Sequence, residues 1–279
     1  MIHTLHLFEE LDDQLLALLT ALPDDAWTLP TVAGAWTVRD VVAHLLDTPL
    51  RRLSFVRDGW PPRDVRVATP EDVVVFVNRL NADGVRVYGR LSPPVLIGLM
   101  ATATAQLRAH LAAAAPSAPA AFAVSWAGEQ ASAHWFDVAR EYTERWHHQA
   151  QIRLAVDALA PILSERLYGP VLATFVHALP YALRHQAAPE GTRLRYVVDG
   201  EGGGAWTLTH RAGTWRLRAA GHDPSADVAP PAAVVRVPAA EAWRVFTKGL
   251  TPEAIAGIAT VEGDAALAAP LLAARAIVG

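Results

Sequence analysis

The sequence predicts an α plus α+β fold, with a helical bundle over residues 1–186 followed by a small α+β unit over residues 187–279. Three observations predict it. Through about residue 185, apolar residues recur at helical spacing in the longer segments. After Gln186, apolar and polar residues alternate, which is the period of half-buried strands. Short glycine-containing stretches separate these alternating runs, as hairpin turns do.

The first two helices are placed by their start and stop residues. Residues 5–22 form an amphipathic pattern that should stop near Pro23. Thr37 can cap a second helix, with Asp40 three residues on in an arrangement like a capping box. Pro49 should kink or end this second helix, because proline removes one backbone donor and crowds the preceding turn.

The remaining helices of the first part follow the same rules. Thr69 is a capping residue followed by proline and two acids, a strong start for a third helix. Another helix is expected to start at Ser92 and to run to about residue 114. After a connection rich in alanine and proline, the sequence predicts a helix over residues 132–157 and one over residues 161–185. Four principal long helices plus extra ones indicate a bundle.

The second part is expected to be built from short strands and helices. Three hairpin-linked strands should cover residues 193–200, 205–210 and 214–220, and a further strand residues 234–238. A helix is expected over residues 239–247, then a strand and a helix within residues 259–277. The glycine cluster 201–204 joins two strands and does not open a helix, so it is not a phosphate-binding loop.

Composition excludes several classes of function. The formal net charge is −4 and no stretch is rich in lysine and arginine, which argues against a nucleic-acid binder. No uninterrupted apolar run approaches the roughly 20 residues of a membrane-spanning helix, and the acidic N-terminus does not resemble a signal peptide. We therefore expect a cytoplasmic protein. Because the chain has no cysteine, any sulfur chemistry must use a thiol from solution.

One predicted helix carries a row of polar side chains at spacings of three and four. The row consists of His134, Asp137, Glu141, Glu144, His148 and Gln151. Helical geometry places all six on one face, with Glu144 and His148 one turn apart. A carboxylate and an imidazole at that spacing can hold one metal ion. The alternative is a solvated helix face, because such rows are common on surfaces.

A catalytic metal site commonly needs a third protein ligand, and His44 is the best candidate. It lies at the edge of an otherwise apolar helical stripe, where an imidazole could point inward. The alternative is an ordinary packed histidine. His147 also lies within helical reach of Glu144, but about 100° around the helix from His148.

The residues around His44 resemble a known family. Residues 36–40 (WTVRD) followed by 43–45 (AHL) are similar to the opening motif of the mycothiol-dependent maleylpyruvate isomerase family. That family belongs to the DinB-like metal-binding four-helix bundles. Its later helix carries an acid or histidine four residues before a second histidine, which Glu144 and His148 match. The resemblance implies a divalent metal, with zinc the expected ion, held by His44, Glu144 and His148, and it favours His148 over His147.

The tail carries the same resemblance. Its ending TVEGDAALAAPLL (residues 260–272) is similar to the family's small sterol-carrier-like C-terminal domain. The chain departs from the family at Lys248, where relatives often carry arginine before the last strand. An anion-binding role inferred from that position does not carry over to this chain.

Two further acids of the row are candidate catalytic residues. Glu141 and Asp137 lie one and two turns before Glu144, where they could accept hydrogen bonds from ligand or substrate groups. The alternative is that they are surface acids paired with Arg140 or Arg145.

The resemblance implies an enzyme of the isomerase or thiol S-transferase kind. The metal would activate a low-molecular-weight thiol, mycothiol or a similar one, for attack on an electrophilic small molecule. Loss of the thiol after addition would isomerise a double bond, whereas retention would give a conjugate. Two alternatives stay open at this point: a hydrolase that activates water with Glu141 as general base, and a non-catalytic protein that binds a metal or an apolar ligand. The partners are small molecules, and the sequence leaves the oligomeric state open.

Overall fold

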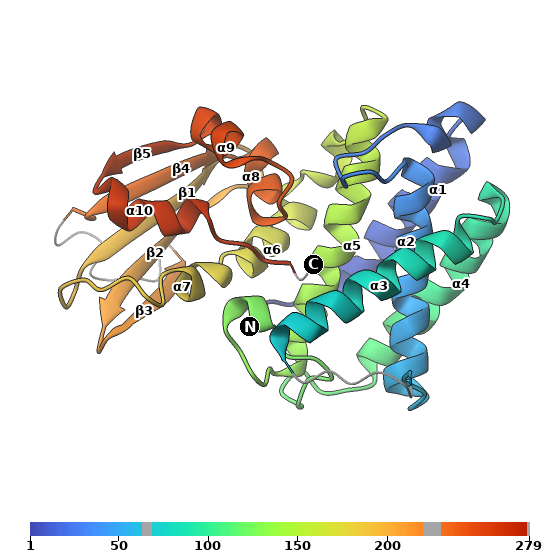
Figure 1. Ribbon diagram of the computed structural model, residues 1–279, viewed down its shortest axis with the longest axis horizontal. Coiled ribbons are helices and arrows are strands. Elements are labelled where there is room, and N and C mark those ends of the chain that lie inside the picture. Colours follow the sequence, from blue (N-terminus) through green and yellow to red (C-terminus); the bar gives the residue numbers. More distant parts are fainter. Residues whose placement is uncertain (63–68, 220–229, 278–279) are drawn as a thin grey trace.

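The computed structural model describes residues 1–62, 69–219 and 230–277, and it confirms the predicted fold class (Figure 1). A helical part is followed by a mixed sheet with its own helices. The long helices of the first part are α1 (Phe8–Ala21), α2 (Val38–Arg52), α3 (Pro70–Tyr88), α4 (Pro93–Ala112) and α5 (His134–Ala155). In Figure 1 the sheet lies to the left and the bundle to the right, with α5 and α6 (Glu165–Phe175) between them.

Helix α2 begins as the sequence predicts. The Thr37 side chain accepts a hydrogen bond from the Asp40 backbone N–H, and the Asp40 carboxylate accepts one from the Thr37 N–H at 2.9 Å, which is a full capping box. Pro49 lies within the helix, which runs three residues further to Arg52. A π-helical turn over Leu53–Arg57 follows. Helix α2 therefore ends soon after the proline, as expected, but not at it.

The prediction of a single helix over residues 161–185 is wrong. The structure instead has α6 and a separate short helix, α7 (Ala178–Ala182). The physical reason is Pro180, which has no N–H to donate to the Val176 carbonyl four residues earlier. That carbonyl accepts from the Leu179 N–H at 3.0 Å, a tighter turn that interrupts the α-helix.

The sheet confirms the predicted hairpins and adds a parallel pairing. Its strands are β1 (Arg193–Asp199), β2 (Gly204–Arg211), β3 (Thr214–Ala219), β4 (Ala233–Pro238) and β5 (Thr260–Gly263), in the order β3-β2-β1-β4-β5. Strand β4 pairs with β1 in parallel, and all other neighbours are antiparallel. The helices α8 (Ala239–Phe246) and α10 (Ala265–Leu272) pack against β4, and α9 (Pro252–Ile258), which the sequence did not predict, lies between them in the chain.

One hydrophobic core joins helix α5, which carries the predicted ligands Glu144 and His148, to the sheet part. Trp146 of α5 stacks on Tyr168 of α6 with ring centroids 4.7 Å apart, and it meets Trp243 of α8 edge-on at 6.0 Å. All three side chains are fully buried. The predicted division into residues 1–186 and 187–279 is thus bridged by continuous packing, and the boundary itself stays a prediction.

A second hydrophobic cluster holds the bundle together. It is formed mainly by α1, α2 and α4, with Val38, Val42 and Met100 among its buried members. Within the described ranges, α4 is the one helix whose length and apolarity would suffice to cross a membrane. A third (33%) of its apolar window is buried, and α4 contributes Leu96 and Met100 to this core.

Candidate metal centre

Helices α2 and α5 run antiparallel and bring the predicted ligands together. His44 of α2 meets His148 of α5, while Arg52, further along α2, meets Asp137, which is earlier on α5. Both histidines are buried. Helix α5 can carry polar groups on this face because its opposite face, with Tyr142 and Trp146, is fixed in the core.

His44 and His148 face each other through the same ring atom. Their Nε2 atoms are 3.1 Å apart, and the ring planes lie nearly edge to face at 70°. The Nδ1 atom of His148 lies 2.8 Å from Gln151 Oε1, an acceptor that fixes the proton on Nδ1 and leaves a lone pair on Nε2. The Nδ1 atom of His44 is buried without a hydrogen-bond partner among the described residues.

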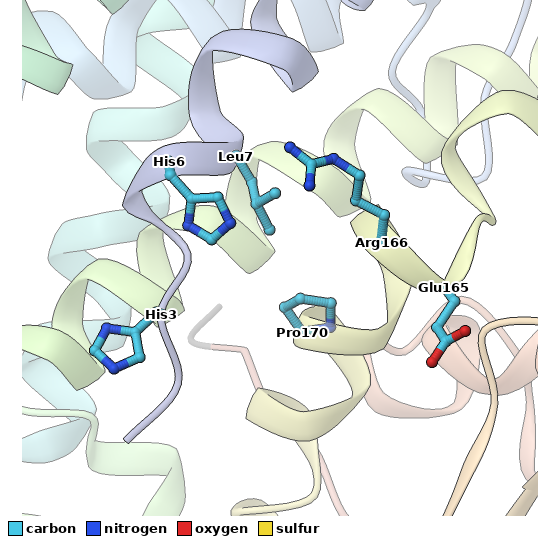
Figure 2. A pocket seen from close by; sticks show the side chains of 6 residues that line it. All are labelled: His3, His6, Leu7, Glu165, Arg166 and Pro170. Atoms are coloured by element: carbon cyan, nitrogen blue, oxygen red, sulfur yellow. The ribbon is translucent and has the colours of Figure 1, made fainter.

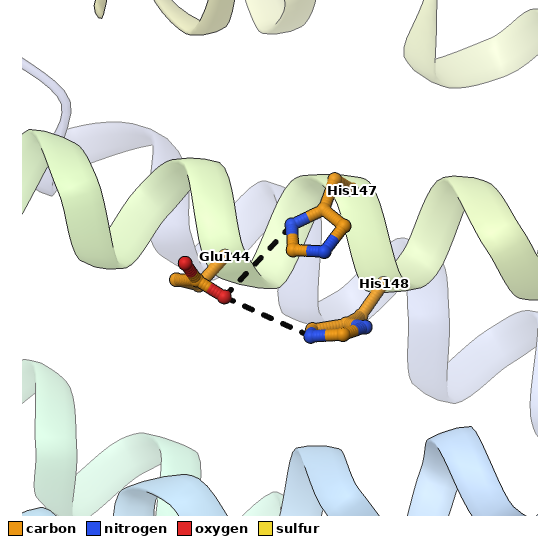
Figure 3. Close-up of side chains that lie close together, drawn as sticks. All are labelled: Glu144, His147 and His148. Carbon is orange, nitrogen blue, oxygen red and sulfur yellow. Dashed lines mark ion pairs between the residues drawn. The ribbon is translucent and has the colours of Figure 1, made fainter. Parts of the chain in front are cut away.

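Glu144 lies beside His147 and His148 on the same helix (Figure 3). Its Oε2 atom lies 3.7 Å from His148 Nε2 and 4.0 Å from His147 Nδ1. The side chain of Glu144 is 29% exposed, so it is the most open of these groups. The ligand atoms of Glu144, His147 and His148 all lie within 4.8 Å of one another, so geometry alone keeps His147 in the candidate set.

The donor atoms of His44 and Glu144 are spaced about His148 Nε2 as ligands of one divalent metal ion would be. A tetrahedral ion with ligands at about 2.0–2.1 Å places neighbouring donor atoms roughly 3.3–3.5 Å apart. The separations of 3.1 Å from His148 to His44 and 3.7 Å from His148 to Glu144 lie on either side of that range. Imidazoles and carboxylates are common ligands of zinc, and the hydrogen bond from His148 Nδ1 to Gln151 Oε1 is the kind of support that orients such a ligand.

Burial keeps the histidines neutral. Desolvation lowers the pKa of His148 to about 3, with the neighbouring His147 adding to the effect, and lowers the pKa of His147 to about 4. Desolvation also lowers the pKa of His44 well below its usual range. Partial burial raises the pKa of Glu144, while His148 and Arg140 oppose that rise. Neutral imidazoles offer the lone pairs that a metal requires.

The candidate catalytic acids Asp137 and Glu141 lie in a buried ion-pair network. Arg52 of α2 donates to both oxygens of Asp137, at 3.2 and 2.7 Å, and lies 3.4 Å from Glu141. Arg140 donates to Asp137 at 2.8 Å and lies 3.4 Å from Glu141. Although burial opposes it, these hydrogen bonds and charges lower the pKa of Asp137.

Sequence reasoning missed Arg52 as a partner of these acids. The proposed pairing with Arg140 is present, but Arg145 instead bonds Asp12 of α1, with Nε 3.0 Å from Oδ1. Arg52 lies in the last turn of α2, and no local spacing links it to α5. An arginine two turns beyond the candidate ligand His44, on the same helix, is the one sequence feature that could have pointed to it.

A separate surface cavity of about 440 Å³ lies elsewhere on the molecule (Figure 2). It is lined by the N-terminal segment and α6, including His3, His6 and Glu165. None of the candidate ligands lines this cavity. The metal candidates are therefore identified by their chemistry and mutual distances, not by a large hollow.

Comparison with known proteins gives a family and a fold. The family profile of the mycothiol maleylpyruvate isomerase N-terminal domain matches residues 8–153. An uncharacterized protein from each of two strains of Mycobacterium tuberculosis is 28% identical over 149 residues, which are 53% of this chain and 54% of the relative. The match thus spans about half the length of these curated relatives.

A solved structure extends the similarity to nearly the whole chain. A crystal structure of a histidine-to-alanine mutant of mycothiol-dependent maleylpyruvate isomerase is similar with a TM-score of 0.51 at 14% sequence identity. The similarity covers 92% of this chain and 91% of that one. At this identity the similarity shows the fold, which includes both the helical part and the sheet part.

Proposed function

This chain belongs to the mycothiol maleylpyruvate isomerase family, and from that premise we propose that it is a divalent-metal-dependent isomerase or thiol S-transferase. Its co-substrate would be a low-molecular-weight thiol, mycothiol or a similar one, and its substrate an electrophilic small molecule. A cytoplasmic location is part of the proposal, because thiols are kept reduced there.

One observation carries the proposal: the Nε2 atoms of His44 and His148 are 3.1 Å apart, and the Glu144 carboxylate lies 3.7 Å from His148. These three residues come from two helices that are far apart in sequence. We propose them as the ligands of a divalent ion, with zinc favoured by the two imidazoles and one carboxylate. His147 is left out of the proposed set because the family motif favours the histidine four residues after Glu144; the Nδ1 atom of His147 lies 3.1 Å from the Thr143 carbonyl.

The chain's own residues prepare this site for an incoming thiol. Burial keeps His44 and His148 neutral at physiological pH, and a neutral imidazole can offer a ring lone pair to a metal. Gln151 fixes the orientation of the His148 ring. Because Glu144 is partly exposed, a thiol and a substrate can approach the proposed metal site from the side of this residue. When bound, a divalent cation here supplies the charge that stabilises a thiolate near neutral pH.

The position of Glu141 disfavours the hydrolase alternative. Its carboxylate is buried and lies 3.4 Å from a guanidinium nitrogen of both Arg52 and Arg140. A general base must reach the proton that it removes with a free lone pair. Both arginines contact the same oxygen, Oε2, and hold the carboxylate in an ion-pair network, so water activation by this residue is the weaker hypothesis.

The proposal is tested first by metal analysis of the purified protein and of His44→Ala and His148→Ala. We expect about one equivalent of divalent metal in the wild type and loss of it in both variants. His134→Ala is the matched control, because His134 is also a buried histidine of α5 but bonds the Leu111 carbonyl at 2.8 Å. Full metal content in both ligand variants would refute the proposed site.

The reaction is tested with the metal-loaded protein, with and without mycothiol. Maleylpyruvate tests isomerisation, and a panel of electrophiles tests conjugation. We expect turnover only when a thiol is present and only with metal bound. Turnover that is equally fast without any thiol would contradict the proposal and favour a hydrolase.

A further inference from the structure

The two ligand-bearing helices are joined at two levels. At one level His44 of α2 meets His148 of α5. At the other level Arg52, eight residues further along α2, bridges to Asp137. Eight helical residues span about 12 Å along the axis. The arginine bridge therefore lies about two turns from the metal ligands and does not touch them.

The salt bridge between Arg52 and Asp137 is directional and buried. Arg52 donates through Nη1 and Nη2 to the two oxygens of Asp137, the paired arrangement in which a guanidinium and a carboxylate bind best. The side chains are 5% and 0% exposed. The guanidinium also lies 5.4 Å from the centre of the Phe122 ring. Such a pair holds one relative position of its partners, because a shift breaks both hydrogen bonds at once.

Apolar packing does not hold the helices this strictly. Hydrophobic contacts between helices tolerate small axial shifts, whereas a buried polar pair is satisfied in one register. A metal site needs ligand distances within about 0.2 Å. The ligands on α2 and α5 must therefore be held at a defined axial offset. The buried, directional hydrogen bonds between Arg52 and Asp137 fix such an offset.

The network acts through position more than through charge. It contains two guanidinium groups, Arg52 and Arg140, and two carboxylates, Asp137 and Glu141. Opposite charges in equal number leave the network without net charge, and the Arg52–Asp137 pair itself lies about two turns from the proposed ligands. Removing Arg52 and Asp137 together keeps the network neutral and should therefore change the geometry of the site rather than its electrostatic attraction for a cation, whereas neutralising Asp137 alone also leaves one net positive charge.

We propose that Arg52 and Asp137 are positioning residues that set the axial register of α2 against α5 and thereby preorganise the metal site. This inference rests on the proposed metal site and assigns Asp137 a role different from contact with substrate. Glu141 and Arg140 complete the neutral network around the bridge.

The test compares two buried salt bridges of the same helix. Asp137→Asn weakens the bridge from α5 to α2. Asp12→Asn weakens the bridge from α5 to α1, in which Asp12 pairs with Arg145, and both of those side chains are 3% exposed. Helix α1 carries none of the proposed ligands, so the second variant is a matched control for lost stability. The measurements are zinc affinity by competition with a chromogenic chelator, the visible spectrum of the cobalt-substituted protein, and urea unfolding.

We expect Asp137→Asn to bind zinc 10–100-fold more weakly and to shift the cobalt bands, because supporting residues commonly contribute that much to metal affinity. Asp12→Asn should lower stability but keep zinc affinity within about threefold of the wild type. The double variant R52M/D137L guards against simple misfolding, because apolar replacement of a buried pair is often well tolerated. It should fold and still bind zinc weakly with shifted bands.

Native zinc affinity and native cobalt bands in the folded Asp137→Asn or R52M/D137L protein would overturn the inference. Equal loss of zinc affinity in Asp12→Asn would also overturn it, because the effect would then be general packing. In both cases the wild type still binds metal, so the proposed function stands. A wild type that binds no metal would overturn the proposed function and, with it, this inference.

Discussion

The buried histidines of α5 make the stability of the metal-free protein depend on pH. The native pKa is about 4 for His147 and about 3 for His148, against a reference of 6.5 for an exposed histidine. Depressed native values mean that the unfolded chain binds more protons. The stability contributed by neutral burial is therefore complete above pH 6.5 and is lost as the pH falls below it.

The magnitude follows from the distance to 6.5. A pH of 5 lies about 1.5 units below the reference pKa of an unfolded histidine, and each unit corresponds to about 1.36 kcal/mol of free energy. Each histidine should therefore cost about 2 kcal/mol of unfolding free energy between pH 7.5 and pH 5, or about 4 kcal/mol for the pair. The result is insensitive to the native values, because both lie below 5.

The assay is urea unfolding of chelator-treated protein at pH 7.5 and pH 5. His147→Asn should reduce the pH-dependent loss by about 2 kcal/mol, and the amide can keep the hydrogen bond to the Thr143 carbonyl. Comparison with the wild type cancels the other titrating groups. Tyr168→Phe is the control, because it changes stability without removing a histidine. An unchanged pH dependence in His147→Asn would refute the reasoning.

Three further predictions concern stability and can be measured by thermal and urea unfolding. Gly84→Ala should cost about 1–3 kcal/mol, because an added methyl group would overlap the Asp47 carboxylate where α3 crosses α2; an unchanged melting temperature would contradict this close approach. Thr37→Ala should cost about 1 kcal/mol by removing the cap of α2, whereas Thr37→Ser should be near neutral. Tyr168→Phe should cost about 1–3 kcal/mol, because its hydroxyl bonds the α8 backbone, including the Trp243 N–H at 3.1 Å; native stability in this variant would show that the bond contributes nothing.

Local features of the fold were predictable from sequence because their partners are close in the chain. The capping box of Thr37 and Asp40 needs residues only three apart. The hairpin from β1 to β2 needs only alternation and a glycine turn. The break between α6 and α7 was also within reach of sequence reasoning, since Pro180 removes a specific backbone donor.

Long-range pairings were beyond sequence reasoning. The parallel pairing of β1 with β4 joins segments separated by two other strands, and no turn residue specifies it. Arg52 looks like an ordinary basic residue in the last turn of a helix, where its charge is favourable anyway. Its burial against Asp137 depends on how α2 and α5 pack.

The sequence by itself determined the residue types and helical spacing of the candidate site: the four-residue step from Glu144 to His148, and His44 within a motif similar to that of a known family. Spacing along one helix is set by backbone geometry, so it can be read from the chain. Only the tertiary structure decided that His44 meets His148 through Nε2, that Gln151 orients His148, and that two arginines neutralise the neighbouring acids. These contacts lie between helices or depend on side-chain rotamers, and packing of the whole bundle selects them.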